Sequence, residues 1–275
     1  MRPIGVPDDI IEFDQSNDVL LARLGEIRSG IERLLHGVPE VSIVMPAFNE
    51  ESSILKTLAC LSRSSTPRSV EIIVVDNNSA DGTAALARSA GALCIAEMQQ
   101  GITPARNAGL AAARGKYILN ADADTLYPPG WIEQMVRPLD NNNTAAVYGR
   151  FSFIPTAGTP RTVYFLYEYA ADFMRWFNKT FREEAVNMYG FNSAFKRKEG
   201  LAVEGFNHPA TANEDGWLAL KLRNGGFGQL YYVRNREALV WTTDRRIQSD
   251  GGLLKGLRKR LLRIFYNRTE IRHDL

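Results

Sequence analysis

The chain has 275 residues, of which 45% are hydrophobic and 23% are charged, and its formal net charge at pH 7 is +2. This length and apolar content suit one large α/β domain or two small ones, and they exclude a mainly disordered chain. A net charge so close to zero gives the whole molecule no attraction to nucleic acid, so we expect no nucleic-acid partner. The charge is uneven, however, because residues 245–275 carry nine Lys and Arg against three Asp and Glu.

Two observations bear on the cellular compartment. Residues 8–14 hold four carboxylates where a signal peptide would need an apolar run, and no stretch approaches the roughly 18 apolar residues of a membrane span. Cys60 and Cys94 show no pairing signature and have no His/Cys cluster nearby. We therefore expect a cytoplasmic protein that neither leaves the cell by that route nor spans a membrane.

Residues 1–40 precede the first clear strand and form an N-terminal extension. Hydrophobic residues recur at helical spacing from Val19 to Leu34, which predicts one amphipathic helix that ends near Gly37. We expect its apolar face to pack on the main domain rather than to serve a dedicated partner.

Strands and helices alternate over the next eighty residues. Strands are predicted at residues 41–45, 71–75, 92–96 and 116–120, with helices at 49–63, after 83 and at 102–113. Strands that are nearly unbroken apolar runs, with helices between them, predict an α/β fold with a mostly parallel sheet and helices on both of its faces.

Polar clusters follow three of these strands, at residues 46–51, 76–81 and 122–125. Open α/β sheets bind ligands at the carboxyl ends of their strands, so the three clusters predict one shared binding site. The first strand is not followed by Gly-X-Gly-X-X-Gly, and no Walker pattern occurs, which disfavours dinucleotide and P-loop binding. A nucleotidyltransferase would need a glycine-rich loop with Arg and Lys where residues 46–50 stand, so this alternative is disfavoured too.

The strand at residues 117–119 runs directly into two carboxylates, Asp122 and Asp124. In an extended segment both side chains point to the same side, where they repel each other unless a cation lies between or beside them. Mg²⁺ and Mn²⁺ take oxygen ligands, commonly one or two carboxylates with substrate phosphates completing the shell. The pair therefore predicts a divalent metal site, and a solvated acidic turn is the alternative.

The later part of the chain offers weaker signals. A strand is predicted over residues 145–153, and residues 161–181 form a helix whose aromatic stripe we assign to the core, with an acceptor groove or a dimer contact as the alternative. Another helix begins at Glu214 and Asp215, where Asp215 is either a helix cap or a functional carboxylate. Residues 251–266 predict a basic amphipathic helix that is either a solvated surface or a peripheral contact with anionic lipid at the inner face of the membrane.

Six motifs in this order resemble glycosyltransferase family 2, whose members have the GT-A fold and transfer sugars from nucleotide diphosphates. The motifs span residues 41–50, 71–79 with 81–83, 101–109, 117–124, 190–197 and 213–215. The resemblance covers roughly residues 41–250. It implies a catalytic domain at 41–243, with a nucleotide-binding half (41–125) and an acceptor half (126–243), followed by a basic loop and helix at 244–275.

The resemblance also implies a donor site for a nucleotide-diphospho-sugar, typically a UDP-sugar. Asp76 would contact the base, Asp122 the ribose or the metal, and Asp124 would ligate Mn²⁺ or Mg²⁺ directly. Arg245 and Arg246 would contact the diphosphate. The complete set of implied donor residues is Pro46, Ala47, Asn49, Glu50, Asp76, Asn78, Arg106, Asp122, Ala123, Arg245 and Arg246.

On the acceptor side, the resemblance places the catalytic base at Asp215 and implies inversion by single displacement onto a hydroxyl of a glycan or a lipid-linked acceptor. The residues implied to contact the acceptor are Glu214, Trp217, Asn192 and His208. His208 also has a purely structural interpretation. The processive members' Gln-X-X-Arg-Trp box does not occur, so we expect a single addition. A catalytically silent binding module with the same fold is the remaining alternative.

Overall fold

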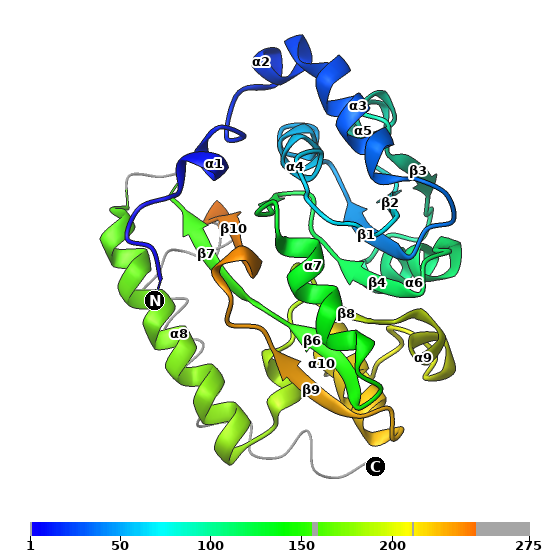
Figure 1. Ribbon diagram of the computed structural model, residues 1–275, viewed down its shortest axis with the longest axis vertical. Helices are drawn as coiled ribbons and strands as arrows, with labels where there is room; N and C mark the ends of the chain where they lie inside the picture. Colours follow the sequence, from blue (N-terminus) through cyan, green and yellow to red (C-terminus); the bar gives the residue numbers. More distant parts are fainter. Residues whose placement is uncertain (1, 156–158, 211, 246–275) are drawn as a thin grey trace.

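The computed structural model describes residues 2–155, 159–210 and 212–245. The strands in this part of the chain are β1 (Val41–Ala47), β2 (Val70–Asp76), β3 (Leu93–Ala96), β4 (Tyr117–Asn120), β5 (Thr125–Leu126), β6 (Thr144–Tyr148), β7 (Arg150–Ile154), β8 (Ser193–Lys196), β9 (Gln229–Tyr232) and β10 (Leu239–Thr243). Seven of them form a central sheet in the order β3, β2, β1, β4, β8, β6, β9 (Figure 1). Only β8 runs against the other strands of this sheet, so the prediction of a mostly parallel sheet is confirmed.

Helices cover both faces of the central sheet (Figure 1). The helices of the described residues are α1 (Asp8–Ile11), α2 (Asn17–Ala22), α3 (Leu24–Leu34), α4 (Ile54–Leu61), α5 (Thr83–Ser89), α6 (Ile102–Ala112), α7 (Trp131–Val136), α8 (Arg161–Phe181), α9 (Arg197–Ala202) and α10 (Glu214–Asn224), with short 3₁₀ turns η1 (Arg137–Asp140), η2 (Glu184–Asn187) and η3 (Arg236–Ala238). Of these, α8 packs on β7 of the second sheet. Successive residues of β1 enter different cores: Ile43 and Met45 pack in one cluster, and Val44 packs in the other. This alternation explains why the strands are apolar throughout.

The predicted strand at 145–153 is in fact two strands, β6 and β7, which belong to different sheets. The chain changes sheet at Gly149, where an added Cβ would lie 2.3 Å from the side-chain nitrogen of Asn192. β7 joins β10 and β5 in a second, three-stranded sheet. Because Gly149 has no side chain, the chain can pass close to Asn192 here, and one continuous apolar segment contributes a strand to each of the two sheets.

The N-terminal extension contains three helices instead of one. The predicted helix is broken at Arg23, whose backbone leaves helical geometry between α2 and α3. Leu20, Ile27 and Ile31 are buried as the amphipathic pattern predicts, and α2 and α3 both contact α4. The extension therefore packs on the main body of the protein.

The aromatic stripe of α8 does not lie in the core, contrary to our assignment. Of its aromatic side chains only Tyr164 is fully buried, whereas Phe173 and Phe181 are mainly exposed. The inward face of α8 carries Glu168 and Arg175 instead. No helix in the described part of the chain combines the length and apolar character of a membrane span.

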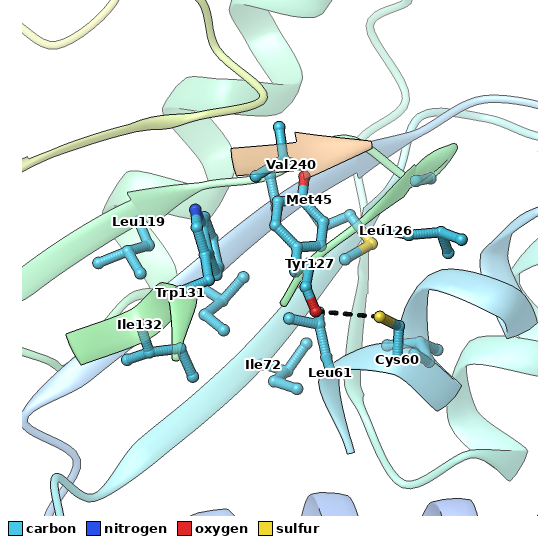
Figure 2. Packing of buried hydrophobic residues seen from close by; sticks show 14 of the residues in the cluster. Met45, Cys60, Leu61, Ile72, Leu119, Leu126, Tyr127, Trp131, Ile132 and Val240 are labelled. Carbon is cyan, nitrogen blue, oxygen red and sulfur yellow. Dashed lines mark hydrogen bonds between the residues drawn. The ribbon is translucent and has the colours of Figure 1, made fainter. Parts of the chain in front are cut away.

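A tightly packed core lies beneath the turn that carries the two candidate metal ligands. Tyr127 and Trp131 contact each other with ring centroids 4.2 Å apart, and Met45 lies beside them (Figure 2). The thiol of Cys60 donates to the backbone carbonyl of Tyr127 at 3.0 Å, and burial raises the pKa of this thiol to about 12. Cys60 and Cys94 are both free, so neither takes part in a disulfide.

Candidate active site

A pocket of about 400 Å³ lies where β1, β2 and β4 end. This is within the range expected of a small-molecule site. The predicted donor residues that line it are Pro46, Ala47, Glu50, Asp122, Ala123 and Asp124. The structure adds lining residues that the sequence did not single out, namely Phe48, Asn77, Gln100, Gly101, Ile102 and Ala105. The polar clusters after these three strands are therefore brought together at one edge of the sheet.

Asn49 and Asn78 do not line the pocket but shape the loops around it. Both have positive φ, 52° and 61°, a region that asparagine tolerates better than most residues. The Asn49 side chain accepts from the backbone of Ala80 at 2.9 Å, and its own backbone N–H donates to Ser79. These bonds tie the loop after β1 to the loop after β2.

Asn77 holds the floor of the pocket. Its side chain donates to the carbonyls of Glu97 and Gln99 and accepts from the backbone of Gly101 at 2.7 Å. Gly101 has φ 137°, which other residues rarely adopt. The neighbouring Asp76 does not line the pocket, and its buried Oδ1 has no hydrogen-bond partner among the described residues.

The segment of Asp122 and Asp124 is a turn and not the extended strand that we expected, yet both residues line the same pocket. The Asp122 carboxylate faces Arg106 Nη2 at 2.9 Å, and the Asp124 carboxylate faces Arg245 at 3.1 Å. The Thr57 hydroxyl donates to the carbonyl of Ala123 and holds the turn. The two carboxylates therefore contact different cations.

Asp215 is the second residue of α10 and is only 6% exposed. It is not the cap of this helix, because Asn213 accepts the hydrogen bond from Gly216 N at 3.1 Å. Its Oδ1 lies 3.9 Å from Arg106 Nε and has no hydrogen-bond partner among the described residues. Burial raises the pKa of Asp215 to about 7, although the positive charge of Arg106 opposes the rise.

Arg106 connects the two halves of the site. It is 2% exposed and contacts both Asp122 and Asp215, which are far apart in the sequence. Gly190 makes this arrangement possible, because a Cβ there would lie 2.2 Å from Arg106 Nη2 and 2.7 Å from the Asp215 carboxylate oxygens. Arg106 therefore positions the two carboxylates and does not line the donor pocket itself.

Arg245 bridges the carboxylates of Glu50 and Asp124, at 2.6 and 3.1 Å. A positively charged group thus lies between these carboxylates, so the charge and spacing of the pair suit a cation. Its sequence neighbour Arg246 and the predicted helix at 251–266 lie outside the described residues.

The oxygen atoms of the pocket decide whether it could bind a divalent metal. No group of three or more His, Cys, Asp or Glu side chains that could hold a metal is found among the described residues. Asp122 and Asp124 offer hard oxygen ligands, and a metal there would need a diphosphate to complete its shell, as is usual for Mg²⁺. The residues fit a metal that arrives with its substrate better than a permanently bound one.

Two of the four predicted acceptor residues have structural roles. Asn192 is buried, accepts from Trp131 Nε1 at 2.8 Å and donates to the carbonyls of Arg150 and Ala238, so it stabilises the fold and contacts no acceptor. His208 Nδ1 lies 2.8 Å from a carbonyl, which requires a proton on Nδ1, and its Nε2 lies 3.0 Å from the Thr103 hydroxyl. Both ring nitrogens are thus engaged.

Glu214 and Trp217 remain near the predicted base. Both are partly exposed on the first turns of α10, beside Asp215. The 3₁₀ turn η2 packs against the same turn of the helix, since the carbonyl of Ala185 lies 3.2 Å from where a Cβ of Gly216 would be. The start of α10 is thus partly exposed next to a buried carboxylate.

Comparisons with known proteins agree with this geometry. A family model described as "Glycosyl transferase family 2" matches residues 42–199. Glycosyltransferase AglE of Haloferax volcanii is 32% identical over 130 residues, which make up 44% of this chain and 43% of AglE. The chain spans less than half the length of the first curated relatives that it matches.

Solved structures share the fold at low sequence identity. The mannosyltransferase PcManGT from Pyrobaculum calidifontis, in complex with GDP-Man and Mn²⁺, has a TM-score of 0.56 at 20% identity, over 92% of this chain and 75% of that chain. TarS of S. aureus, in complex with UDP-GlcNAc, has a TM-score of 0.57 at 16% identity, over 74% of this chain and 58% of that one.

Proposed function

The chain belongs to glycosyltransferase family 2, and we propose from this and from the site that it transfers a sugar from a nucleotide diphosphate to an acceptor hydroxyl. The observation that carries the proposal is that Asp122 and Asp215 meet on one buried arginine, Arg106, beside a pocket built at the carboxyl ends of β1, β2 and β4. The nucleotide side and the start of α10 are thus joined in a single site.

The donor in this proposal is a UDP-sugar. The similar structures bind GDP-Man and UDP-GlcNAc, which supports a nucleotide-diphospho-sugar in general. The buried Oδ1 of Asp76 would accept a base N–H, which a uracil offers. Asp124, with Asp122, would hold a divalent metal on the diphosphate, and the metal, when bound, supplies positive charge to the departing phosphate.

Asp215 is proposed as the general base of a single displacement. Its carboxylate takes the proton of the acceptor hydroxyl while the hydroxyl oxygen forms a bond to the anomeric carbon from the side opposite the diphosphate. The bond from that carbon to the diphosphate oxygen breaks, and its electron pair leaves with the diphosphate. A pKa of about 7 suits this role, because the carboxylate is then both basic and substantially ionised near neutral pH.

Arg245 takes two positions in this proposal. In the first, which the structure shows, its guanidinium pairs with the carboxylates of Glu50 and Asp124. When metal and diphosphate enter, the same group would turn to the diphosphate oxygens, which it can contact through two parallel hydrogen bonds. The acceptor is proposed to be a glycan or lipid-linked hydroxyl, with one sugar added per encounter. Peripheral membrane contact through residues 251–266 and an inner-face location belong to the same proposal.

The test of this function is the variant Asp215→Asn. We expect transfer from a UDP-sugar to be abolished while UDP affinity in the presence of Mn²⁺ stays within a few fold, because the base acts on the acceptor and not on the nucleotide. Asp18→Asn is the matched control, since Asp18 also lies in the first turn of a helix but is exposed on α2. Transfer that persists in Asp215→Asn would remove this residue from the role of base.

A thermal-shift series tests the donor. Stabilisation of the wild-type chain by UDP only when Mn²⁺ is present would support a metal-linked diphosphate site. Equal effects of all nucleotides, with or without metal, would contradict it. Binding without turnover of any donor would favour a silent binding module.

A further inference from the structure

Helix α8 turns its charged side chains toward the protein and its large apolar side chains outward. Glu168 is fully buried and accepts from Arg2 Nη1 at 3.2 Å and from Arg161 at 3.0 Å. Asp172 accepts from Arg2 Nε at 2.6 Å, and the buried Arg175 lies within the same network. The inward side of the helix is therefore an ion-paired layer instead of an apolar one.

The outward side is a row of apolar residues along the whole helix. Leu166, Phe173 and Phe181 are 69%, 59% and 62% exposed. Several of the aromatic rings pack on each other: Phe173 and Trp176 have centroids 5.5 Å apart, and Trp176 and Phe181 have centroids 5.6 Å apart. The members of this face, which we call the outward face of α8, are Val163, Leu166, Tyr169, Phe173, Trp176 and Phe181.

The buried ion pairs hold this orientation. A rotation of α8 that buried the aromatic side chains would pull Glu168 and Asp172 away from Arg2 and leave charges without partners, which is strongly destabilising. The outward face is consequently an exposed apolar surface that the fold itself maintains. Contiguous surfaces of this kind mark contacts with other molecules.

Charge and shape indicate which partner the outward face suits. The only carboxylates of α8, Glu168 and Asp172, are engaged on the inward side, so no acidic side chain interrupts the outward face. Trp, Tyr, Phe and Leu are residues through which helices lie in the membrane interface. The helix forms one long outer edge of the molecule (Figure 1).

The basic end of the chain departs from beside α8. Tyr164 of α8 donates a hydrogen bond to the buried carboxylate of Asp244, the residue before Arg245. Residues 246–275, which lie outside the described part of the chain, carry eight basic and three acidic residues. A cluster of Lys and Arg adds attraction to anionic lipid, which a second copy of this chain, itself positively charged, would not provide.

We propose that the outward face of α8 rests on the surface of an anionic lipid bilayer, lying in the interface and not across it. This surface is distinct from the expected helix at 251–266, and the docking does not depend on which sugar the site transfers. It would set the acceptor half of the protein against the membrane, because η2 connects α8 to the start of α10, where Asp215 lies.

The first test is flotation of the full chain with phosphatidylcholine vesicles that contain about 30% phosphatidylglycerol. We expect the wild-type chain to float with these vesicles, and Leu166→Gln/Phe173→Gln to reduce the partition coefficient about tenfold or more, because two inserted apolar side chains are lost. The matched control is Leu21→Gln/Val38→Gln, which changes two residues that are similarly exposed far from α8 and should float like the wild type.

The second test reads the contact itself. In a Trp217→Phe background, which removes the partly exposed tryptophan of α10, brominated lipid should quench the fluorescence of Trp176, which is half exposed on the outward face. The buried Trp131 and Trp241 should be unaffected. The conservative variant Trp176→Phe should keep binding to the vesicles and lose the quenching.

Three results would overturn the proposal. One is a wild-type chain that does not float with anionic vesicles. Another is a Leu166→Gln/Phe173→Gln variant that floats as well as the wild type, or quenching that survives in Trp176→Phe. The third is a wild-type dimer in vesicle-free solution that the α8 variant converts to a monomer, since the outward face would then be covered by a second copy.

Discussion

The two halves of the catalytic region, residues 41–125 and 126–243, are held in place by contacts of different range. In the first half, loops near in sequence support each other, as when Asn49 accepts from Ala80, 31 positions away. In the second half, key side chains depend on remote partners, as when Arg2 pairs with Glu168, 166 positions away. The comparison teaches that local sequence pattern places much of residues 41–125, whereas key side chains of residues 126–243 are fixed only in the assembled fold.

Gly190→Ala should have the largest effect, because it breaks the contact that joins the halves. The new methyl group would lie 2.2 Å from Arg106 Nη2 and must push the guanidinium away from Asp215. We expect the transfer rate to fall about 100-fold or more, since displacements of about 1 Å in a site have that effect. Steady-state kinetics measure it.

The control for this variant is Gly25→Ala. Gly25 lies in α3, and an added Cβ would have no heavy atom within 4 Å. Activity should be unchanged, and the free energy of unfolding should rise by about 0.5–1 kcal/mol because alanine favours a helix. A Gly190→Ala enzyme as fast as the wild type would show that the halves do not act through Arg106.

Asn192→Ala should separate a structural role from an acceptor role. The change leaves Trp131 Nε1 and the carbonyls of Arg150 and Ala238 without a buried partner. We expect the free energy of unfolding, measured in urea, to fall by about 2–3 kcal/mol. The KM for the acceptor should stay near that of the wild type. A large rise in this KM with little loss of stability would show instead that Asn192 contacts the acceptor.

The pH dependence of kcat/KM tests the role of Asp215 without a change in the protein, and near neutral pH its effect on the rate should be the smallest of those predicted here. Burial raises the pKa of Asp215 to about 7, and the base must be ionised, so the rate should fall about tenfold per pH unit below that value and level off above it. Glu214→Gln should move this limb to lower pH, because the charge of Glu214 contributes to the rise. A profile that is flat from pH 5 to 8 would contradict the assignment.

Burial of Asp215 also links pH to stability. Its pKa in the folded state is above the ordinary value of 3.8, so the folded chain binds a proton more tightly than the unfolded chain does. The stabilising contribution of the protonated group is therefore present at low pH and is lost as pH rises toward 7. The burial that would suit Asp215 to act as a base therefore lowers the stability of the fold at neutral pH.

Much of the first half could be predicted from the sequence. Its strands β1 and β2 are apolar at most positions because both faces of the sheet are covered, and this pattern can be recognised from each strand's own residues. The sequence did not decide the backbone conformation at Asp122 and Asp124, because these residues are compatible with both an extended segment and a turn. Gly101 lies in one of the family-like motifs, but its hydrogen bond to the Asn77 side chain becomes apparent only when the two loops are brought together in the fold.

The structure of residues 126–243 is harder to predict from nearby residues in the sequence. Gly149 inside an apolar run is a known sign of a bend, yet nothing nearby indicates that the two pieces enter different sheets. In α8 the apolar and charged residues both recur at helical spacing, so the sequence does not say which face turns inward. Arg2, at the other end of the chain, decides it.

Arg245 bridges Glu50 and Asp124, so any divalent ion that took Asp124 as a ligand would first have to displace a positive charge that the chain itself supplies. An ion delivered together with a diphosphate would meet this requirement more easily, because the displaced guanidinium could then pair with the diphosphate oxygens. The net charge of the cleft would change little when such a ligand entered.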